Sequence, residues 1–305
     1  MTVTEWAGPP AFLPPPPATT RPDGVRHVAG ASYACPPGYR RLKLDLWVPA
    51  GDRPAPLVVW VHGGAWMIGD RLELPETLRP GQVFDALLAA GCAVATVDYR
   101  HALEAAFPAQ LHDAKAAVRW LRHFAADLGL DTTRIGVWGE SAGGHLAALV
   151  GLTAHRADLE GDSGVTGPSS AVDVVVDWYG VADLSTMPRM TPPQEIAEKL
   201  PPEMRVPPED LLLGGLDDDA AADASPITHV TATAPPFLLL HGSADWLVPP
   251  TQSDELAAAL TAAGATAVLE HVPGAGHVWL GHDDVDGVVD RSVAFLVDHL
   301  QERPV

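Results

Sequence analysis

The stretch from Ile135 to Val150 constrains the fold of this chain more than any other. It begins with an apolar run, 135–138, of the kind that forms a buried strand. The pentapeptide Gly-Glu-Ser-Ala-Gly follows at 139–143, and small and apolar residues then continue at helical spacing. A strand that turns this sharply into a helix needs glycine on both sides of the central serine, because larger side chains would collide. The pattern predicts a strained turn that lifts the Ser141 hydroxyl out at the positive end of a helix.

The rest of the chain alternates short apolar runs with helical patterns. This alternation is typical of an α/β fold with a mostly parallel central sheet and helices on both faces. Further strands are predicted at 41–48, 56–61, 92–97, 172–176, 237–240 and 267–272, and helices at 83–90, 108–127, 254–263 and 285–300. Strict alternation over 41–48 predicts a half-buried strand near a sheet edge, whereas the continuous apolar run 56–61 predicts a central strand.

Two stretches break this rhythm and define the predicted domain organisation. Residues 1–30 are rich in proline and predict an extended arm that is ordered only where it docks. Residues 31–305 are predicted to form a single α/β domain. Within it, about 184–223 is rich in Pro, Met and acidic residues and predicts a short helical cap over the sheet, with a plain surface excursion as the alternative.

The charge of the chain excludes several classes of partner. Among 305 residues, 39 are acidic and 19 are basic, which gives a formal net charge of −20. A chain with this much negative charge repels phosphate backbones and anionic lipid. We therefore expect no nucleic-acid and no membrane partner. The N-terminus has no basic start with a long apolar core, and no apolar run is long enough to span a bilayer. These features predict a cytoplasmic protein, and they leave a homo-oligomer open.

Motifs for metals and cofactors do not occur in the sequence. The two cysteines, Cys35 and Cys92, suggest neither a disulfide framework nor a thiolate metal site. There is no His-Glu-x-x-His pattern, no P-loop and no dinucleotide-binding glycine motif after the first strand. We therefore expect no metal and no cofactor.

Candidate catalytic groups follow apolar runs, at the predicted carboxyl end of the sheet. They are Ser141, Asp245, His277 and the turn at Gly63–Gly64. A serine hydroxyl becomes a nucleophile when a base removes its proton, and histidine is the base that suits neutral pH. A buried carboxylate fixes the imidazole tautomer and stabilises the imidazolium. Backbone N–H groups of Gly64, Ala65 and Ala142 are expected to stabilise the negative charge of a tetrahedral intermediate, forming an oxyanion hole.

Other polar and aromatic residues near these motifs have structural interpretations. We expect His62 to brace the glycine turn, His241 to be structural, and Asp98 and Arg100 to form a structural ion pair. Histidines within predicted helices, at 112, 123 and 145, are expected at the surface or in packing. Tryptophans near the strand ends predict either an apolar substrate pocket or ordinary packing, and the candidates for substrate contact are Trp66, Trp178 and Trp279.

Six stretches, in order along the chain, resemble a known family. The chain resembles the carboxylesterase branch of the α/β-hydrolases, which is related to hormone-sensitive lipase and to bacterial acyl esterases. Within it, the closest resemblance is to the feruloyl/acetyl-xylan-esterase-like group, which also resembles kynurenine formamidases. The stretches are Trp60-Val-His-Gly-Gly-Ala-Trp66, Val97-Asp-Tyr-Arg100, Phe107-Pro-Ala-Gln-Leu-His-Asp113, Trp138-Gly-Glu-Ser-Ala-Gly-Gly-His145, Leu240-His-Gly-Ser-Ala-Asp245 and Gly276-His277.

The resemblance implies an α/β-hydrolase fold with Ser141 as nucleophile, His277 as base and Asp245 as the group that orients the base. It also implies an oxyanion hole from the turn after His62 and from the residue after the nucleophile. The chain departs from many relatives in two places, since Ala65 stands where they carry a third glycine and His101 where they carry leucine. The proline-rich arm and the predicted cap match no motif of the family.

These observations predict a serine hydrolase that cleaves carboxylic esters with small or short-chain acyl or aryl groups through an acyl-enzyme. Two alternatives stay open at this point. The same triad could act on an aryl-formamide, a lactone or a thioester, or the chain could be a non-catalytic binding protein on a hydrolase scaffold.

Overall fold

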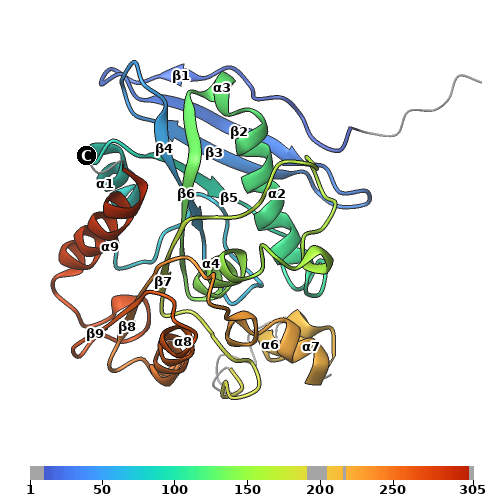
Figure 1. Ribbon diagram of the computed structural model, residues 1–305, viewed down its shortest axis with the longest axis vertical. Coiled ribbons are helices and arrows are strands. Elements are labelled where there is room, and N and C mark those ends of the chain that lie inside the picture. The colour runs from blue at the N-terminus through green and yellow to red at the C-terminus, as the bar shows by residue number, and fades with distance from the viewer. Residues whose placement is uncertain (1–9, 191–204, 216–217, 302–305) are drawn as a thin grey trace, which may run out of the picture.

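The computed structural model describes residues 10–190, 205–215 and 218–301 and contains a central nine-stranded sheet. The strand order is β1-β2-β3-β5-β4-β6-β7-β8-β9. Strands β1, β2 and β3 pair antiparallel with their neighbours, and all strands from β5 to β9 in this order pair parallel. The predicted α/β architecture with a mostly parallel sheet is therefore confirmed (Figure 1).

The elements have the following bounds. The strands are β1 (Thr19–Thr20), β2 (Arg26–Ala34), β3 (Leu42–Val48), β4 (Ala55–Val61), β5 (Ala93–Val97), β6 (Leu130–Glu140), β7 (Val174–Trp178), β8 (Phe237–Gly242) and β9 (Ala267–Val272). The helices are α1 (Gln82–Ala89), α2 (Ala109–His123), α3 (Ala125–Leu128), α4 (Ala142–Leu152), α6 (Pro208–Leu213), α7 (Asp218–Asp223), α8 (Thr251–Ala262) and α9 (Val285–Leu300). Short 3-10 turns are η1 (Ala157–Leu159), η3 (Pro226–His229) and η4 (His277–Trp279).

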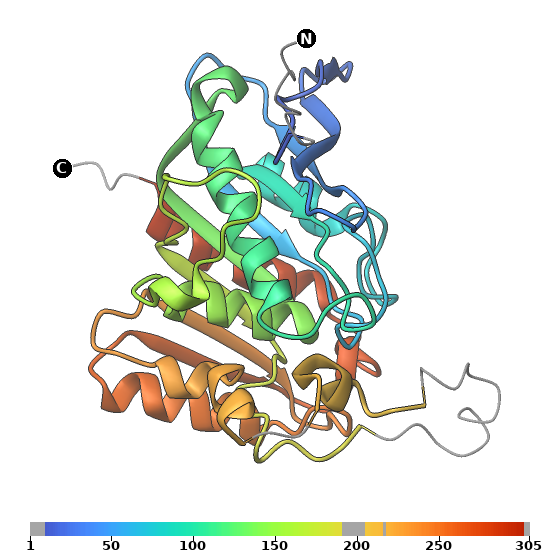
Figure 2. The same ribbon diagram turned by 90° about the vertical axis from the view of Figure 1, so that its right-hand side faces the viewer.

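Helices cover both faces of the sheet and bury two apolar cores. Helices α1 and α9 contribute to the core on one face, and α2, α4 and α8 to the core on the other. Figure 2 shows the green helices α2 and α4 in front of the sheet and the red helix α9 behind it. The continuous apolar sequences of β4 and β5 follow from this layering, because a strand covered on both faces has no side that meets water.

Strand β3 is third from one edge of the sheet, near the edge as predicted, but it is mostly buried and not half-buried. Strands β1 and β2 lie outside it, and five of its seven residues are buried. The buried set includes Asp45, an acidic position in the alternating pattern, which pairs with Arg71 at 2.6 Å and with His27 at 2.7 Å. A charged residue can thus take an inward position here because its partners neutralise it.

The predicted boundary of the proline-rich arm at residue 30 is also wrong, because residues 26–30 belong to β2. The part of the arm that the structure describes docks on the body. Phe12 packs edge-on against the rings of His123 and Phe124, with centroids 5.8 and 6.1 Å away. The backbone of Leu13 is held from both sides, since its N–H donates to the Ser32 carbonyl at 2.9 Å and its carbonyl accepts the Trp120 indole N–H at 2.9 Å.

The predicted cap at about 184–223 is described in part. It contains the short helices α6 and α7, and residues 191–204 and 216–217 lie outside the described residues. Helix α6 is joined to the body by a hydrogen bond of 2.7 Å from the Phe107 N–H to the Leu212 carbonyl. That this segment caps the candidate site stays a prediction.

Truncating the aromatic anchor of the arm should destabilise the domain. We expect Phe12→Ala to lower the free energy of unfolding by about 1–2 kcal/mol, since the ring is half-buried against two aromatic neighbours. Urea denaturation measures the change. The control is Leu72→Ala, at a side chain that is 52% exposed, which should change stability by less than about 0.5 kcal/mol. Equal effects of the two substitutions would show that the arm does not contribute to the fold.

Candidate active site

The turn between β6 and α4 places Ser141 in a strained conformation. Its φ of 53° is rare for a residue with a side chain, and its N–H donates to the Trp178 carbonyl at 2.8 Å. A Cβ at Gly139 would lie 2.1 Å from the Gly143 carbonyl oxygen, and one at Gly143 would lie 2.1 Å from the carbonyl oxygen of Val61. Both glycines are therefore required by backbone contacts, as the sequence predicts.

Three predicted side chains form a continuous hydrogen-bonded series. The Ser141 Oγ lies 3.0 Å from His277 Nε2, and His277 Nδ1 lies 2.7 Å from Asp245 Oδ2. Residues that are 136 and 32 positions apart in sequence meet here, because the strands that precede them end at the same edge of the parallel sheet. The arrangement is what a general base needs in order to take a proton from a serine hydroxyl.

The carboxylate of Asp245 is held by several donors. Its Oδ1 accepts the N–H groups of Leu247 at 2.9 Å and Val248 at 3.0 Å, and His241 Nε2 lies 3.5 Å from its Oδ2. Burial alone would raise the pKa of Asp245, but the hydrogen bonds from His241 and His277 outweigh burial and hold the pKa well below its usual range. Asp245 is therefore ionised at neutral pH, the state that orients an imidazole.

His277 stands on a loop whose backbone is itself strained. The two residues after it, Val278 and Trp279, have φ values of 52° and 63°, and such a φ is a genuine outlier for a β-branched residue. The Tyr179 ring packs edge-on against the imidazole, with centroids 4.8 Å apart. The Gly276 N–H closes the loop by donating to the Leu280 carbonyl at 2.7 Å. The histidine is thus positioned by packing and by a closed loop, and only 7% of its surface is exposed.

The predicted oxyanion turn follows β4. Gly64, Ala65 and Trp66 have φ values of 99°, 52° and 57°, and the N–H groups of Met67 and Ile68 both donate to the Gly64 carbonyl. Within the described part of the chain, the N–H groups of Gly64, Ala65 and Ala142 donate no hydrogen bond. Unused N–H groups in a turn and at a helix start are suited to receive negative charge.

A glutamate that the sequence analysis did not single out lies beside this turn. Oε1 of Glu140 accepts the Gly63 N–H at 2.7 Å, so Gly63 is not available as a donor to substrate. Behind the turn, the Tyr99 ring stacks on His62 with centroids 4.4 Å apart, and its hydroxyl donates to the His62 and Gly63 carbonyls, each at 3.1 Å. The one sequence signal for Glu140 is its position inside the serine pentapeptide.

The histidines predicted to be structural have structural contacts. His62 Nδ1 lies 2.8 Å from the Gly63 carbonyl, and burial lowers the pKa of His62 to about 4, so this ring is neutral at pH 7. His241 contacts the Ser253 hydroxyl and the Val248 carbonyl. His145 bridges the Trp66 indole and the Ala224 carbonyl inside the core.

Direct substrate contact by the three tryptophans is not supported by the structure. Trp66, Trp178 and Trp279 have no exposed surface. The indole N–H of Trp178 donates to Ser292 Oγ at 2.9 Å, and its ring packs edge-on against Trp279 with centroids 5.1 Å apart. These residues are packing groups, which was the alternative interpretation of the pattern. Among the tryptophans in the described ranges, the exposed one is Trp246, at 75%, directly after Asp245.

Asp98 and Arg100 do not pair with each other. Arg100 binds both carboxylate oxygens of Asp113, at 2.7 and 2.8 Å, and Asp98 lies 3.4 Å from Arg71. The structural role predicted for them holds, but with different partners. The ring of His101, for which the sequence offered no explanation, packs edge-on near Tyr99 with centroids 6.0 Å apart.

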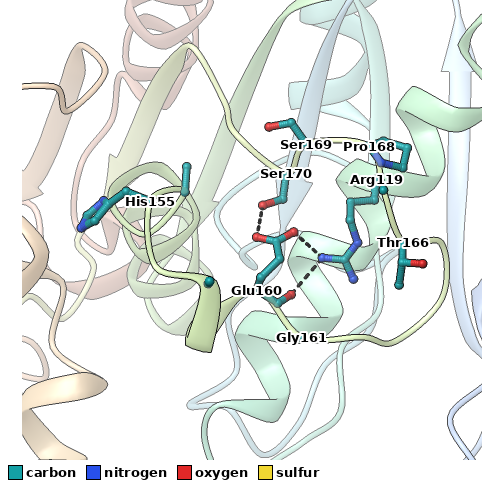
Figure 3. A pocket seen from close by; sticks show the side chains of 11 residues that line it. Arg119, His155, Glu160, Gly161, Thr166, Pro168, Ser169 and Ser170 are labelled. Atoms are coloured by element: carbon teal, nitrogen blue, oxygen red, sulfur yellow. Dashed lines mark hydrogen bonds and ion pairs between the residues drawn. The ribbon is translucent and has the colours of Figure 1, made fainter.

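A cleft of about 450 Å³ lies away from these residues, between α2, η1 and the loop 161–170 (Figure 3). Glu160 stands between Arg119 and Ser170 and bonds to both, at 2.6 and 2.7 Å. Arg119 also donates to the carbonyls of Val165 and Ser163. The charged groups of this cleft are satisfied by the protein itself. We therefore interpret these bonds as bracing the loop 161–170, and not as a second binding site.

The described residues contain no group of three or more His, Cys, Asp or Glu side chains that could hold a metal ion. Within the same described ranges, no helix is long and apolar enough to cross a membrane.

Comparisons with known proteins agree with this geometry. Residues 44–260 match the protein family BD-FAE. The chain is 34% identical over 262 residues to Esterase LipC of Mycobacterium tuberculosis, and the match covers 83% of this chain and 60% of LipC, so the chain spans less than two thirds of that relative. Among solved structures, a truncated carbohydrate esterase from gut microbiota superposes with a TM-score of 0.77 and 29% identity, covering 93% of this chain and 99% of that one. Esterase 2 of Thermogutta terrifontis, phosphorylated by paraoxon, superposes with a TM-score of 0.69 and 26% identity, covering 90% and 95%.

Replacing Ala65 by glycine tests the strain of the oxyanion turn. The positive φ costs a residue with a Cβ about 1 kcal/mol, whereas glycine adopts it freely. We expect Ala65→Gly to leave the free energy of unfolding unchanged or to raise it by up to about 1 kcal/mol, as measured by urea denaturation. The control is Ala258→Gly in helix α8, where φ is helical and the same change should cost about 1 kcal/mol. A similar loss in the free energy of unfolding at both positions would show that the backbone of Ala65 is not strained.

The buried carboxyl group of Asp177 should make stability depend on pH. Burial raises its pKa to about 6, and the hydrogen bond from the Gly180 N–H offsets this only in part. Between pH 4 and 6 the folded state binds more protons at this group than the unfolded state, so its contribution to stability falls as pH rises. As the pH rises from 4 to 6, the free energy of unfolding of Asp177→Asn should increase relative to that of the wild type, by about 3 kcal/mol in total. Urea denaturation at each pH measures the gain, and the exposed Asp290→Asn should show none.

Proposed function

Because the chain belongs to the BD-FAE family and has the α/β-hydrolase fold, we propose that it is a serine esterase that hydrolyses carboxylic esters. The observation that carries this proposal is the unbroken series Ser141 Oγ, His277 and Asp245, with contacts of 3.0 and 2.7 Å. The two solved neighbours support it, because one is a carbohydrate esterase and the other an esterase that paraoxon phosphorylates.

In the proposed acylation step, His277 takes the proton of Ser141 while Oγ attacks the ester carbonyl. The tetrahedral oxygen gains negative charge and accepts the free N–H groups of Gly64, Ala65 and Ala142. As the intermediate collapses, His277 returns the proton to the leaving alcohol and the acyl group stays on the serine oxygen. Asp245 keeps the Nδ1 proton in place and stabilises the imidazolium throughout.

Deacylation repeats these roles with water as the nucleophile. His277 takes a proton from water, the hydroxide attacks the acyl-enzyme, and Ser141 leaves with that proton as the acid is released. Every step uses side chains and N–H groups of the chain, so we propose a reaction without metal or cofactor. We propose small esters with short acyl or aryl groups as substrates and no nucleic-acid partner. Both cysteines are free thiols, which supports the expected cytoplasmic location.

Removing the nucleophile tests the assignment. We expect Ser141→Ala to lower kcat for 4-nitrophenyl acetate by about a million-fold, because triad members act as a unit. A fluorophosphonate probe should label the wild type and not the variant, and Ser169→Ala on the loop 161–170 should label like the wild type. Retained turnover by the Ser141→Ala variant would overturn the proposal, and an unlabelled wild type would favour a non-catalytic binding protein.

A substrate panel tests the bond that is cleaved. The same enzyme is given aryl esters, an aryl-formamide, a lactone and a thioester at matched concentrations, and kcat/KM is compared. We expect the esters to be preferred. A formamide, lactone or thioester preferred by more than about 100-fold, which is about 2.7 kcal/mol in transition-state binding, would assign the site to that bond instead.

A further inference from the structure

Glu140 occupies an unusual position for a charged side chain. It is the last residue of β6, directly before Ser141, and only 8% of its surface is exposed. Its Oε1 accepts the Gly63 N–H at 2.7 Å. A Cβ at Gly63 would lie 2.1, 2.6 and 2.7 Å from Oε1, Cδ and Oε2, so the carboxyl group lies flat against that residue. The glutamate therefore holds the backbone immediately before the proposed oxyanion donors.

The same residue lies near the proposed base, because Glu140 directly precedes Ser141, whose Oγ lies 3.0 Å from His277 Nε2. Burial raises the pKa of Glu140, while the charge of His277 and the hydrogen bond from Gly63 oppose this rise. The Tyr179 hydroxyl lies close to the carboxyl group as well, although its geometry falls short of a full hydrogen bond. The Tyr179 ring in turn packs against His277. Glu140 thus contacts one half of the site and acts on the other.

We propose that Glu140 is a positioning residue that fixes the oxyanion turn through Gly63 and supplies His277 with a second buried negative charge besides Asp245. This inference rests on the proposed esterase function. The first effect keeps the N–H groups of Gly64 and Ala65 aimed at one point. The second favours the imidazolium that forms when Ser141 is deprotonated, and it acts strongly because water is excluded from the site.

The surroundings of the histidine define what a titration should report. The titratable groups that interact electrostatically with Glu140 are His277, Tyr99 and Tyr179, and the Glu140 charge raises the pKa of each tyrosine in addition to the larger effect of burial. The groups that face His277 are Asp245, Glu140, Tyr179 and Ser141. Neither tyrosine titrates near neutral pH. A shift in the acid limb of the pH profile of kcat/KM after a change at Glu140 therefore reports the effect of the Glu140 charge on His277.

The decisive substitution is Glu140→Gln, which keeps an acceptor for the Gly63 N–H and removes the charge. We expect kcat to fall by about 10-fold with KM within about twofold, because the lost interaction belongs to the imidazolium of the transition state. Removing a negative charge disfavours the protonated base, so the acid limb of the kcat/KM profile should move by about one pH unit to lower pH. Glu140→Ala, which also frees Gly63, should lose a further 10- to 100-fold in kcat.

Two further variants complete the test. Glu140→Asp keeps the charge but withdraws it from Gly63, so we expect a lower kcat with the acid limb near its wild-type position. This variant carries the test of the bracing of Gly63 if Glu140→Gln does not fold. The matched control is Glu209→Gln, since Glu209 is also buried and its Oε1 accepts a backbone N–H at 2.7 Å, from Met190. Its acid limb should not move.

The outcomes separate this inference from the proposed function. If the acid limb of the kcat/KM profile does not move in Glu140→Gln, the proposed charge role is wrong, whether or not the melting temperature falls. Glu140 would then have a structural role only. Unchanged kcat in Glu140→Ala would overturn the bracing of the turn. Both results require that the wild type is active and Ser141→Ala is not. If the wild type is inactive, or if Ser141→Ala is active, the esterase assignment is wrong. That result does not depend on the pH profiles of the Glu140 variants.

Discussion

The candidate site depends on the direct contact of three backbone segments at the carboxyl ends of β4 and β6. Gly143, at the start of α4, touches the Val61 carbonyl, and Gly139 touches Gly143. Gly63 completes the contact by lying against the carboxyl group of Glu140. Because none of the three glycines has room for a Cβ, the serine turn and the oxyanion turn form one packed unit whose parts cannot move independently. The hydroxyl of Ser141 and the N–H groups of Gly64 and Ala65 are thereby fixed relative to each other before a substrate arrives.

Backbone strain is concentrated at the same edge of the sheet. Every described residue other than glycine with a positive φ lies in a strand-end loop of the site, namely Ala65, Trp66, Ser141, Tyr179, Val278 and Trp279. Conformations of this kind cost about 1–3 kcal/mol each and persist only where the surroundings enforce them. The buried aromatic cluster does so here, since the rings of Trp138, Trp178 and Trp279 pack edge-on in series. The tryptophans thus hold the loops of the candidate site, which explains why they fall next to the motifs although they are buried.

Features of this fold that are encoded locally can be predicted from the sequence, whereas those that depend on remote partners cannot. Apolar runs and the glycines around Ser141 predict strands and a turn from neighbouring residues alone, so those elements appear where they were expected. The first five residues of β2 fall within the predicted arm, because the sequence of this strand, with Gly30 and three alanines, has no apolar period of its own and is buried by pairing with β3. The partner of Glu140 is Gly63, 77 positions away, and no local pattern indicates which way that carboxylate points.

The buried carboxylates around the site show why donors, and not burial alone, decide charge in this protein. Asp245 accepts two backbone N–H groups and contacts two histidines, and its pKa is lowered despite burial. Asp177 and Glu140 each accept one backbone N–H group, from Gly180 and from Gly63, and their pKa values are raised. Burial of a charge with too few donors costs stability. In the proposed reaction the oxyanion turn follows the same rule, because the N–H groups of Gly64 and Ala65 have no acceptor among the described residues and gain one only when the tetrahedral oxygen becomes charged. For the proposed ester hydrolysis, a site built in this way stabilises the transition state more than the neutral ester that precedes it.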